Sequence, residues 1–254
     1  MGFLERTRLF GKEESCEGSS FYMLGGKGNM IDVHFYDWAK KRPKKHYNRL
    51  HEMRIFELIF SKELSRLDLG LETVENIDIY CLANPNKDIS YELCEDLWEI
   101  CIFVPYDYMQ FLNLESVEEK YKHFCELVHL YVVPAIEKYS KISLEMIKEY
   151  VDEALQEIEK ENYEIVFLVD KTPKKSPSRK KTAILKGIHR SEGFQLMCEV
   201  YNDKGLRVVN KLLVEEVGNE VVYSRFLGKL KWENEHLIVV KSKTSSWMEE
   251  VHVE

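Results

Sequence analysis

The pattern of apolar residues changes near residue 162, and this change constrains the fold more than any other feature of the sequence. Before it, apolar residues recur at helical spacing in two long segments, 116–139 and 143–161. After it, runs rich in Val, Ile, Leu, Phe and Tyr alternate with turn signals such as RSEG and YNDKG. We therefore predict an α+β domain over residues 1–162 and an antiparallel β domain over residues 163–254 that packs against it.

The first domain is predicted to contain a hairpin, two further strands and three to four helices. The hairpin covers residues 21–36 around the turn GGKGN, and the strands are ENIDIYCLA (75–83) and WEICIFVPY (98–106). A helix begins near Pro43 and ends near Gly70, and a short helix over 90–97 lies between the strands. Ser116 and Glu119 form a capping box ahead of the helix 116–139, which Pro134 should kink or end.

The second domain is predicted to be a six-stranded antiparallel meander, because short turns separate its strand-like runs. These runs are YEIVFLV (163–169), TAILKGIH (182–189), FQLMCEVY (194–201), LRVVNKLLVEEV (206–217), EVVYSRFLGKL (220–230) and HLIVVKS (236–242). The sequence leaves open whether this sheet curls into a barrel.

Charge is unevenly distributed along a chain whose formal net charge is -8. Two clusters hold basic residues and no acids: Lys40, Lys41, Arg42, Lys44 and Lys45; and Lys171, Lys174, Lys175, Arg179, Lys180 and Lys181. The second cluster contains Pro173 and Pro177 and links two predicted strands. Its simplest interpretation is a mobile, solvent-exposed hairpin loop. Alternatives are contact with phosphates, docking of an acidic protein, and self-association with an acidic helix face.

Two further features suggest a protein-binding surface. Tyr106, Tyr108 and Phe111 follow an apolar strand, where they suit either an interface or core packing. The helix 143–161 carries an acidic face, which suits either a basic partner or simple solvation. Its candidate contact residues are Glu145, Glu149, Asp152 and Glu153.

Motifs for catalysis and for metals are weak in this sequence. The nucleophile elbow G-x-S-x-G is absent, and most cysteines lie in apolar stretches, which raises a thiol pKa. Cys125 and His129 have metal-ligand spacing, but no second pair accompanies them. We expect no metal and no cofactor.

The location expected is the cytoplasm, without membrane association. The opening MGFLERTRLFGKEE has no apolar core of a secretory signal, and no apolar run approaches the ~18–20 residues of a membrane span.

Three functions follow as hypotheses. The first is a non-catalytic binding protein that masks or scaffolds a protein partner, comparable in composition to immunity or inhibitor proteins. The second is nucleic-acid or phosphate binding through both basic clusters, which requires that the clusters share one face. The third is an enzyme whose site is assembled from dispersed residues such as Asp32, His34, His189 and Glu199.

Overall fold

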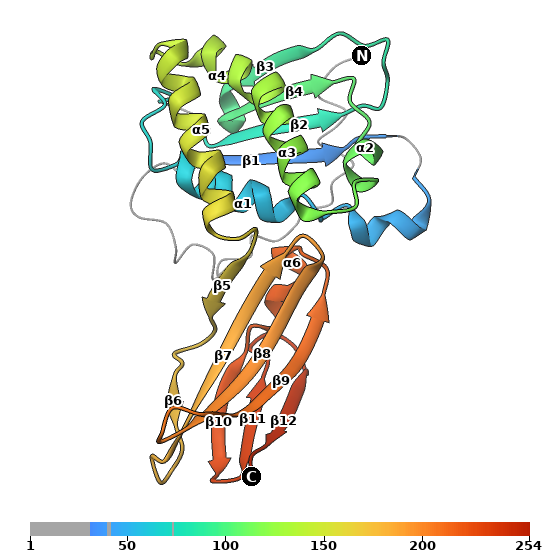
Figure 1. Cartoon of the computed structure of the whole chain (residues 1–254). Coiled ribbons are helices and arrows are strands. Elements are labelled where there is room, and N and C mark those ends of the chain that lie inside the picture. The colour runs from blue at the N-terminus through green and yellow to red at the C-terminus, as the bar shows by residue number, and fades with distance from the viewer. Residues whose placement is uncertain (1–30, 40–41, 73) are drawn as a thin grey trace.

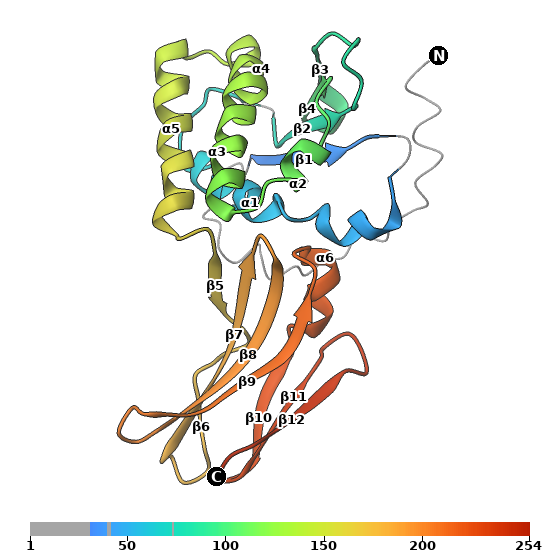
Figure 2. The ribbon, with the colours of Figure 1, turned by 45° about the vertical axis from the view of Figure 1, so that its right-hand side comes forward.

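The computed structural model describes residues 31–39, 42–72 and 74–254, and it has the α+β architecture that the sequence predicts. The first strand of the predicted 21–36 hairpin and its GGKGN turn lie outside the described residues. Figures 1 and 2 show a helix-rich N-terminal part and a strand-rich C-terminal part placed end to end.

The N-terminal part is built on a mixed sheet with strand order β1-β2-β4-β3. Strands β1 (Asp32–Asp37), β2 (Asn76–Cys81) and β4 (Glu99–Val104) are parallel, and β3 (Ser90–Cys94) is antiparallel to β4. Apolar side chains on one face, such as Val33, Ile77 and Ile102, pack in one core with the helices. Figure 1 shows α3 (Val117–Leu127), α4 (Val133–Tyr139) and α5 (Leu144–Lys160) over that face.

Helix α1 (Arg54–Leu64) lies along the free edge of β1 and satisfies its backbone donors. The amides of Val33 and Phe35 donate to Ser61 Oγ and Glu57 Oε1, both at 2.8 Å. Glu57 and Ser61 stand four residues apart, so they share one helix face. This arrangement explains two buried polar side chains and closes an otherwise open sheet edge.

Three predictions for this part need correction. The segment 90–97 forms β3 and a 3-10 turn (Glu95–Leu97) rather than a helix, because β3 pairs with β4. The helix predicted from Pro43 is divided into a 3-10 helix (Lys44–Arg49) and α1. Of the two outcomes predicted at Pro134, a kink or an end of the helix 116–139, the end does not occur, because a π-helical segment (Val128–Val132) precedes Pro134 and joins α3 to α4. The capping box of Ser116 and Glu119 is confirmed. A short helix, α2 (Met109–Leu112), follows β4.

The C-terminal part pairs strands in two groups among the described residues. The first has the order β5-β7-β8-β9, formed by β5 (Ile165–Leu168), β7 (Lys181–Arg190), β8 (Gly193–Asn202) and β9 (Arg207–Glu216), with β6 (Lys174–Lys175) paired to β7. The second has the order β10-β11-β12, formed by β10 (Lys229–Asn234), β11 (Leu237–Lys241) and β12 (Met248–His252). Side chains of both groups, such as Leu196 and Val240, form one core.

Here too the structure departs from the predicted meander. The first half of 220–230 forms α6 (Glu220–Tyr223) and a 3-10 turn (Ser224–Phe226), because Asn219 caps the amides of Val221 and Val222. Strand β12 was not predicted, and the described strands do not close into a barrel.

The described residues form separate core clusters in the N-terminal and C-terminal parts. This separation supports a domain boundary near residue 162, which stays a prediction. Polar contacts join the parts: Arg54 to Glu220 at 2.8 Å, and Ser191 Oγ to the Glu52 carbonyl at 2.8 Å. Within the described ranges, no helix has the length and apolar character needed to cross a membrane.

Candidate functional site

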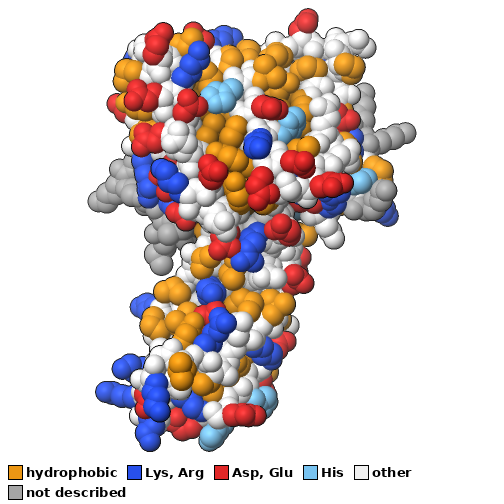
Figure 3. All heavy atoms as spheres, viewed as in Figure 1, with side chains coloured by type: hydrophobic (Ala, Val, Ile, Leu, Met, Phe, Trp, Pro, Cys, Tyr) orange, Lys and Arg blue, Asp and Glu red, His pale blue; other side chains and the backbone are white. Residues whose placement is uncertain are grey.

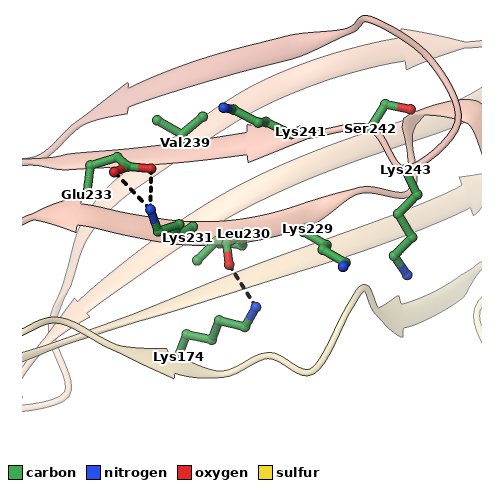
Figure 4. A pocket seen from close by; sticks show the side chains of 9 residues that line it. All are labelled: Lys174, Lys229, Leu230, Lys231, Glu233, Val239, Lys241, Ser242 and Lys243. Carbon is green, nitrogen blue, oxygen red and sulfur yellow. Dashed lines mark hydrogen bonds and ion pairs between the residues drawn. The ribbon is translucent and has the colours of Figure 1, made fainter.

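A lysine-lined groove of about 590 Å³ lies on the outer surface of the C-terminal part. Its walls come from β6, β10, β11 and the turn after β11, as Figure 4 shows. Among the described residues that line it, Glu233 is the one acid. The lining consists of Lys174, Lys229, Leu230, Lys231, Glu233, Val239, Lys241, Ser242 and Lys243.

Strand alternation brings these lysines to one surface. Lys229 and Lys231 are exposed while Leu230, between them, is buried, so the two lysines point away from the core. On the neighbouring strand, Lys241 stands directly opposite Lys229 in the antiparallel register. Like charges placed opposite each other destabilise a sheet. The presence of Lys229 opposite Lys241 is therefore not explained by a contribution to the stability of the sheet.

The groove keeps positive charge after its internal ion pairs are considered. Lys231 pairs with Glu233 at 3.0 Å, and Lys174 pairs with Asp170 and donates to the Leu230 carbonyl at 2.7 Å. Lys229, Lys241 and Lys243 form no ion pair with the described residues. These ammonium groups are available for an anion.

The basic stretch 171–181 links β5 to β7, as the sequence suggested, and it also contacts β10 and the turn after it. Trp232 Nε1 donates to the Lys174 carbonyl at 3.1 Å, and Ser178 Oγ donates to Glu235 at 2.8 Å. Thr172 and Ser176 are buried. These contacts place the stretch next to the groove, because Lys174 belongs to both.

The end of this stretch is a tight turn that presents cations. The Ser176 amide donates to the Lys181 carbonyl and the Arg179 amide donates to the Ser176 carbonyl, each at 2.9 Å. Arg179 has a φ of 64° at the turn. Over the whole stretch 171–181, four cationic side chains are exposed, two of them in the turn, whereas Lys181 contacts the Glu254 carbonyl. The four are Lys171, Lys175, Arg179 and Lys180. Figure 3 shows Lys and Arg side chains gathered at this far end of the C-terminal part.

Arg42 and Lys44, the described side chains of the other basic cluster, lie in the N-terminal part. Lys40, Lys41 and the Lys45 side chain lie outside the described residues. Arg42 is held in the N-terminal part by Asp37 at 2.7 Å and Asp107 at 2.5 Å. Lys44 begins the 3-10 helix of the same part. The hypothesis of nucleic-acid binding through both clusters requires that they share one face, and Arg42 and Lys44 do not meet this requirement.

The predicted aromatic patch is part of the core. Tyr106, Tyr108 and Phe111 are 7%, 1% and 0% exposed. The Tyr108 hydroxyl donates to the Leu50 carbonyl at 3.0 Å, and the Tyr106 hydroxyl lies 2.8 Å from His123 Nε2. These rings pack between strand and helix, so they are corrected from contact residues to core residues.

The acidic helix face is exposed as the sequence suggested. Glu145, Glu149, Asp152 and Glu153 project from α5 into solvent. Asp152 pairs with His129 of the helical segment before it, at 3.1 Å.

A second polar cluster surrounds Arg54 at the junction of the two parts. Arg54 pairs with Asp32, Glu57 and Glu220 and lies 3.2 Å from His34 Nδ1. Burial, assisted by the Arg54 guanidinium, lowers the pKa of His34 to about 4, and burial raises the pKa of Glu57 to about 8. The acidic side chains and the imidazole of this cluster therefore each contact the Arg54 guanidinium.

Of the four dispersed residues of the enzyme hypothesis, Asp32, His34 and His189 lie near Arg54, and Glu199 lies apart from them. Asp32 and His34 lie beside Arg54, but Glu199 is paired with Lys186 at 2.7 Å on β7. His189 is buried on β7, which lowers its pKa to about 3 and keeps it neutral at pH 7.

On β2, burial and the nearby Glu99 carboxylate raise the pKa of Asp78 to about 8. No group of three or more His, Cys, Asp or Glu side chains in the described part of the chain is arranged to hold a metal ion.

Comparison with protein-family models, with curated proteins and with solved structures finds no match to this chain. Sequence reasoning missed the lysines of β10 and β11. For Lys229 and Lys231 the signal was the alternation in KLKWE, which places every second residue on one strand face, whereas Lys243 follows the end of β11.

Proposed function

We propose that this protein is a non-catalytic binding protein that binds the phosphate backbone of nucleic acid through the lysine-lined groove. The observation that carries the proposal is the groove itself, where five lysines and one acid line about 590 Å³ of open space. Lysine ammonium groups are compact point charges that bind phosphate oxygens without reading base sequence.

The charge distribution along the chain supports this proposal. Residues 163–254 hold 16 Lys and Arg against 13 Asp and Glu, a net charge of +3, whereas residues 1–162 hold 20 against 31, a net of -11. A polyanion is therefore attracted to the C-terminal part and repelled by the N-terminal part. Binding of this type releases counterions and weakens as salt rises.

The test compares two charge-matched variants of the full chain by fluorescence anisotropy with labelled DNA and RNA. The groove variant carries Lys229→Glu, Lys241→Glu and Lys243→Glu, and the control carries Lys87→Glu, Lys122→Glu and Lys148→Glu in the N-terminal part. We expect the groove variant to bind at least about tenfold more weakly than the control, since it loses phosphate contacts. Equal affinities of the two variants would contradict the proposal.

A protein partner is the second candidate function, and the exposed acidic face of α5 favours it. The four carboxylates share one side of a helix, where they would steer a basic protein into contact. The variant Glu145→Lys, Glu149→Lys, Asp152→Lys and Glu153→Lys tests this idea by affinity capture from the native host. A single protein retained in stoichiometric amount by the wild type and lost from the variant supports this function; equal retention by both refutes it.

A further inference from the structure

We infer that the ligand of the groove is a double-stranded nucleic acid rather than a single strand, and that the turn at Arg179 and Lys180 is part of the contact. This inference rests on the proposed function and specifies its substrate class.

The basic surface is a track rather than a single anion site. It follows β10, whose six residues extend over roughly 17–20 Å at the usual rise of a strand. Lys229, Lys241 and Lys243 lie toward one end, and the contact of Ser178 with Glu235 places the 171–181 turn at the other. A nucleic-acid strand advances about 3.4 Å per nucleotide, so the track matches roughly five or six nucleotides of a linear polymer.

Aromatic side chains near the track are partly buried against the core. None of the described residues that line the groove is aromatic. Trp232, on β10, alternates to the inner face and donates its Nε1 proton to the Lys174 carbonyl. Trp247 and Phe226 pack against each other and against the same core, with ring centroids 5.5 Å apart.

This arrangement favours a duplex over a single strand. Proteins that bind single strands gain about 1–3 kcal/mol per base from stacking on aromatic rings, and the groove offers no such ring among its described lining residues. A duplex presents its phosphates outward and needs only cations. It also carries one charge per about 1.7 Å of axis, twice the density of one strand.

The turn is anchored to Glu235, just after β10, so the backbone of Arg179 and Lys180 is held beyond the Glu233 end of the groove. Both the backbone amide and the hydroxyl of Ser178 donate to Glu235, and the turn is closed by the hydrogen bonds of Ser176. Because the backbone is held, these cations reach a phosphate with little further ordering of the chain. Neither side chain forms an ion pair with a described residue.

The experiment measures binding of the full chain to a labelled DNA duplex and to each of its separated strands at one salt concentration. We expect the duplex to bind at least about tenfold more tightly than either strand. We expect Arg179→Glu with Lys180→Glu to weaken duplex binding about tenfold and to reduce the salt slope by about two. The control is Lys122→Glu with Lys148→Glu, which leaves duplex binding within about twofold of the wild type if only long-range repulsion changes.

Each outcome decides a different claim. Single strands that bind as tightly as the duplex overturn the preference for a duplex while the proposed function stands. Absence of binding to every nucleic acid rejects the proposed function itself. A turn variant that binds like the control overturns the role of Arg179 and Lys180. Should the charge reversal disturb folding, Arg179→Gly with Lys180→Ala gives the same test, because glycine suits the positive φ of residue 179.

Discussion

At the scale of single residues, Glu57 shows how a buried carboxyl can be structural. Its Oε1 accepts the Phe35 amide and its Oε2 accepts Arg54, so it links the edge of β1 to α1. Burial raises its pKa to about 8. The folded protein therefore binds this proton up to a higher pH than the unfolded chain does, and the contribution of Glu57 to stability is present at low pH and decreases as pH rises from about 4.5 through 8.

The decrease of this stability contribution with rising pH leads to a prediction for Glu57→Gln. Glutamine keeps the acceptor for Phe35 but does not ionise, so the variant lacks this loss of stability. We expect the free energy of unfolding of the wild type, relative to the variant, to fall by a few kcal/mol between pH 5 and 9, at about 1.4 kcal/mol per unit of pKa difference. Urea unfolding across this pH range measures it. Parallel pH profiles for the two proteins would show that Glu57 is already ionised in the folded state.

Local patterns in the sequence predict the position and burial of some side chains and not of others. The alternation of lysines around Leu230 could be read directly, but the position of Lys241 opposite Lys229 depends on register, which no local pattern gives. The burial of Tyr108 could not be separated from exposure at an interface, because tyrosine suits both. The sequence does not distinguish Glu57 from a carboxylate on an exposed helix surface, because its burial depends on contact with β1.

At the scale of elements, the groove depends on the close approach of β10 to β11. Gly228 precedes β10, and a Cβ atom there would lie 2.1 Å from the Lys241 carbonyl oxygen. Backbone atoms on β11 cannot yield without moving the strand, so glycine is required at this position for steric reasons.

We therefore predict that Gly228→Ala lowers stability by about 1–3 kcal/mol or more, as overpacking does. It should also weaken nucleic-acid binding, because Lys229 and Lys241 are displaced together. Thermal unfolding and anisotropy measure the two effects. The control is Gly205→Ala, since a Cβ at Gly205 meets no atom within 4 Å, although its φ of 74° adds some strain. A Gly228→Ala protein that is more stable than the control would contradict this account.

Elements with strong periodicity were predicted from the sequence, and those set by tertiary pairing were not. Helix α5 and strands β7 and β8 follow from their apolar patterns. From its sequence alone, the segment of β3 is predicted to be a short helix. It forms a strand because it pairs with β4. The apolar run EVVYSRF reads as a strand, although Asn219 ahead of it is a helix N-cap.

At the scale of the whole molecule, partly buried polar contacts join the two parts in the described regions. Arg54, 12% exposed, pairs across the junction with Glu220, and Asn219 lies 3.3 Å from His51. We predict that Glu220→Ala lowers the free energy of unfolding by about 1–3 kcal/mol, because a hydrogen-bonded charge pair is lost while Arg54 keeps Asp32 and Glu57. Urea unfolding measures this, with Glu192→Ala as an exposed control in the same part. Equal stability of the two variants would show that the junction is held by other contacts.

The most direct test of nucleic-acid binding by the groove is the salt dependence of the binding constant for a DNA duplex. The groove and turn offer five cations without an ion pair to the described residues: Lys229, Lys241, Lys243, Arg179 and Lys180. The account predicts that the logarithm of the binding constant falls with the logarithm of salt concentration with a slope of about -4 to -5, and of about -2 for the variant Lys229→Glu, Lys241→Glu and Lys243→Glu. A flat dependence, or the same slope for both proteins, would contradict it.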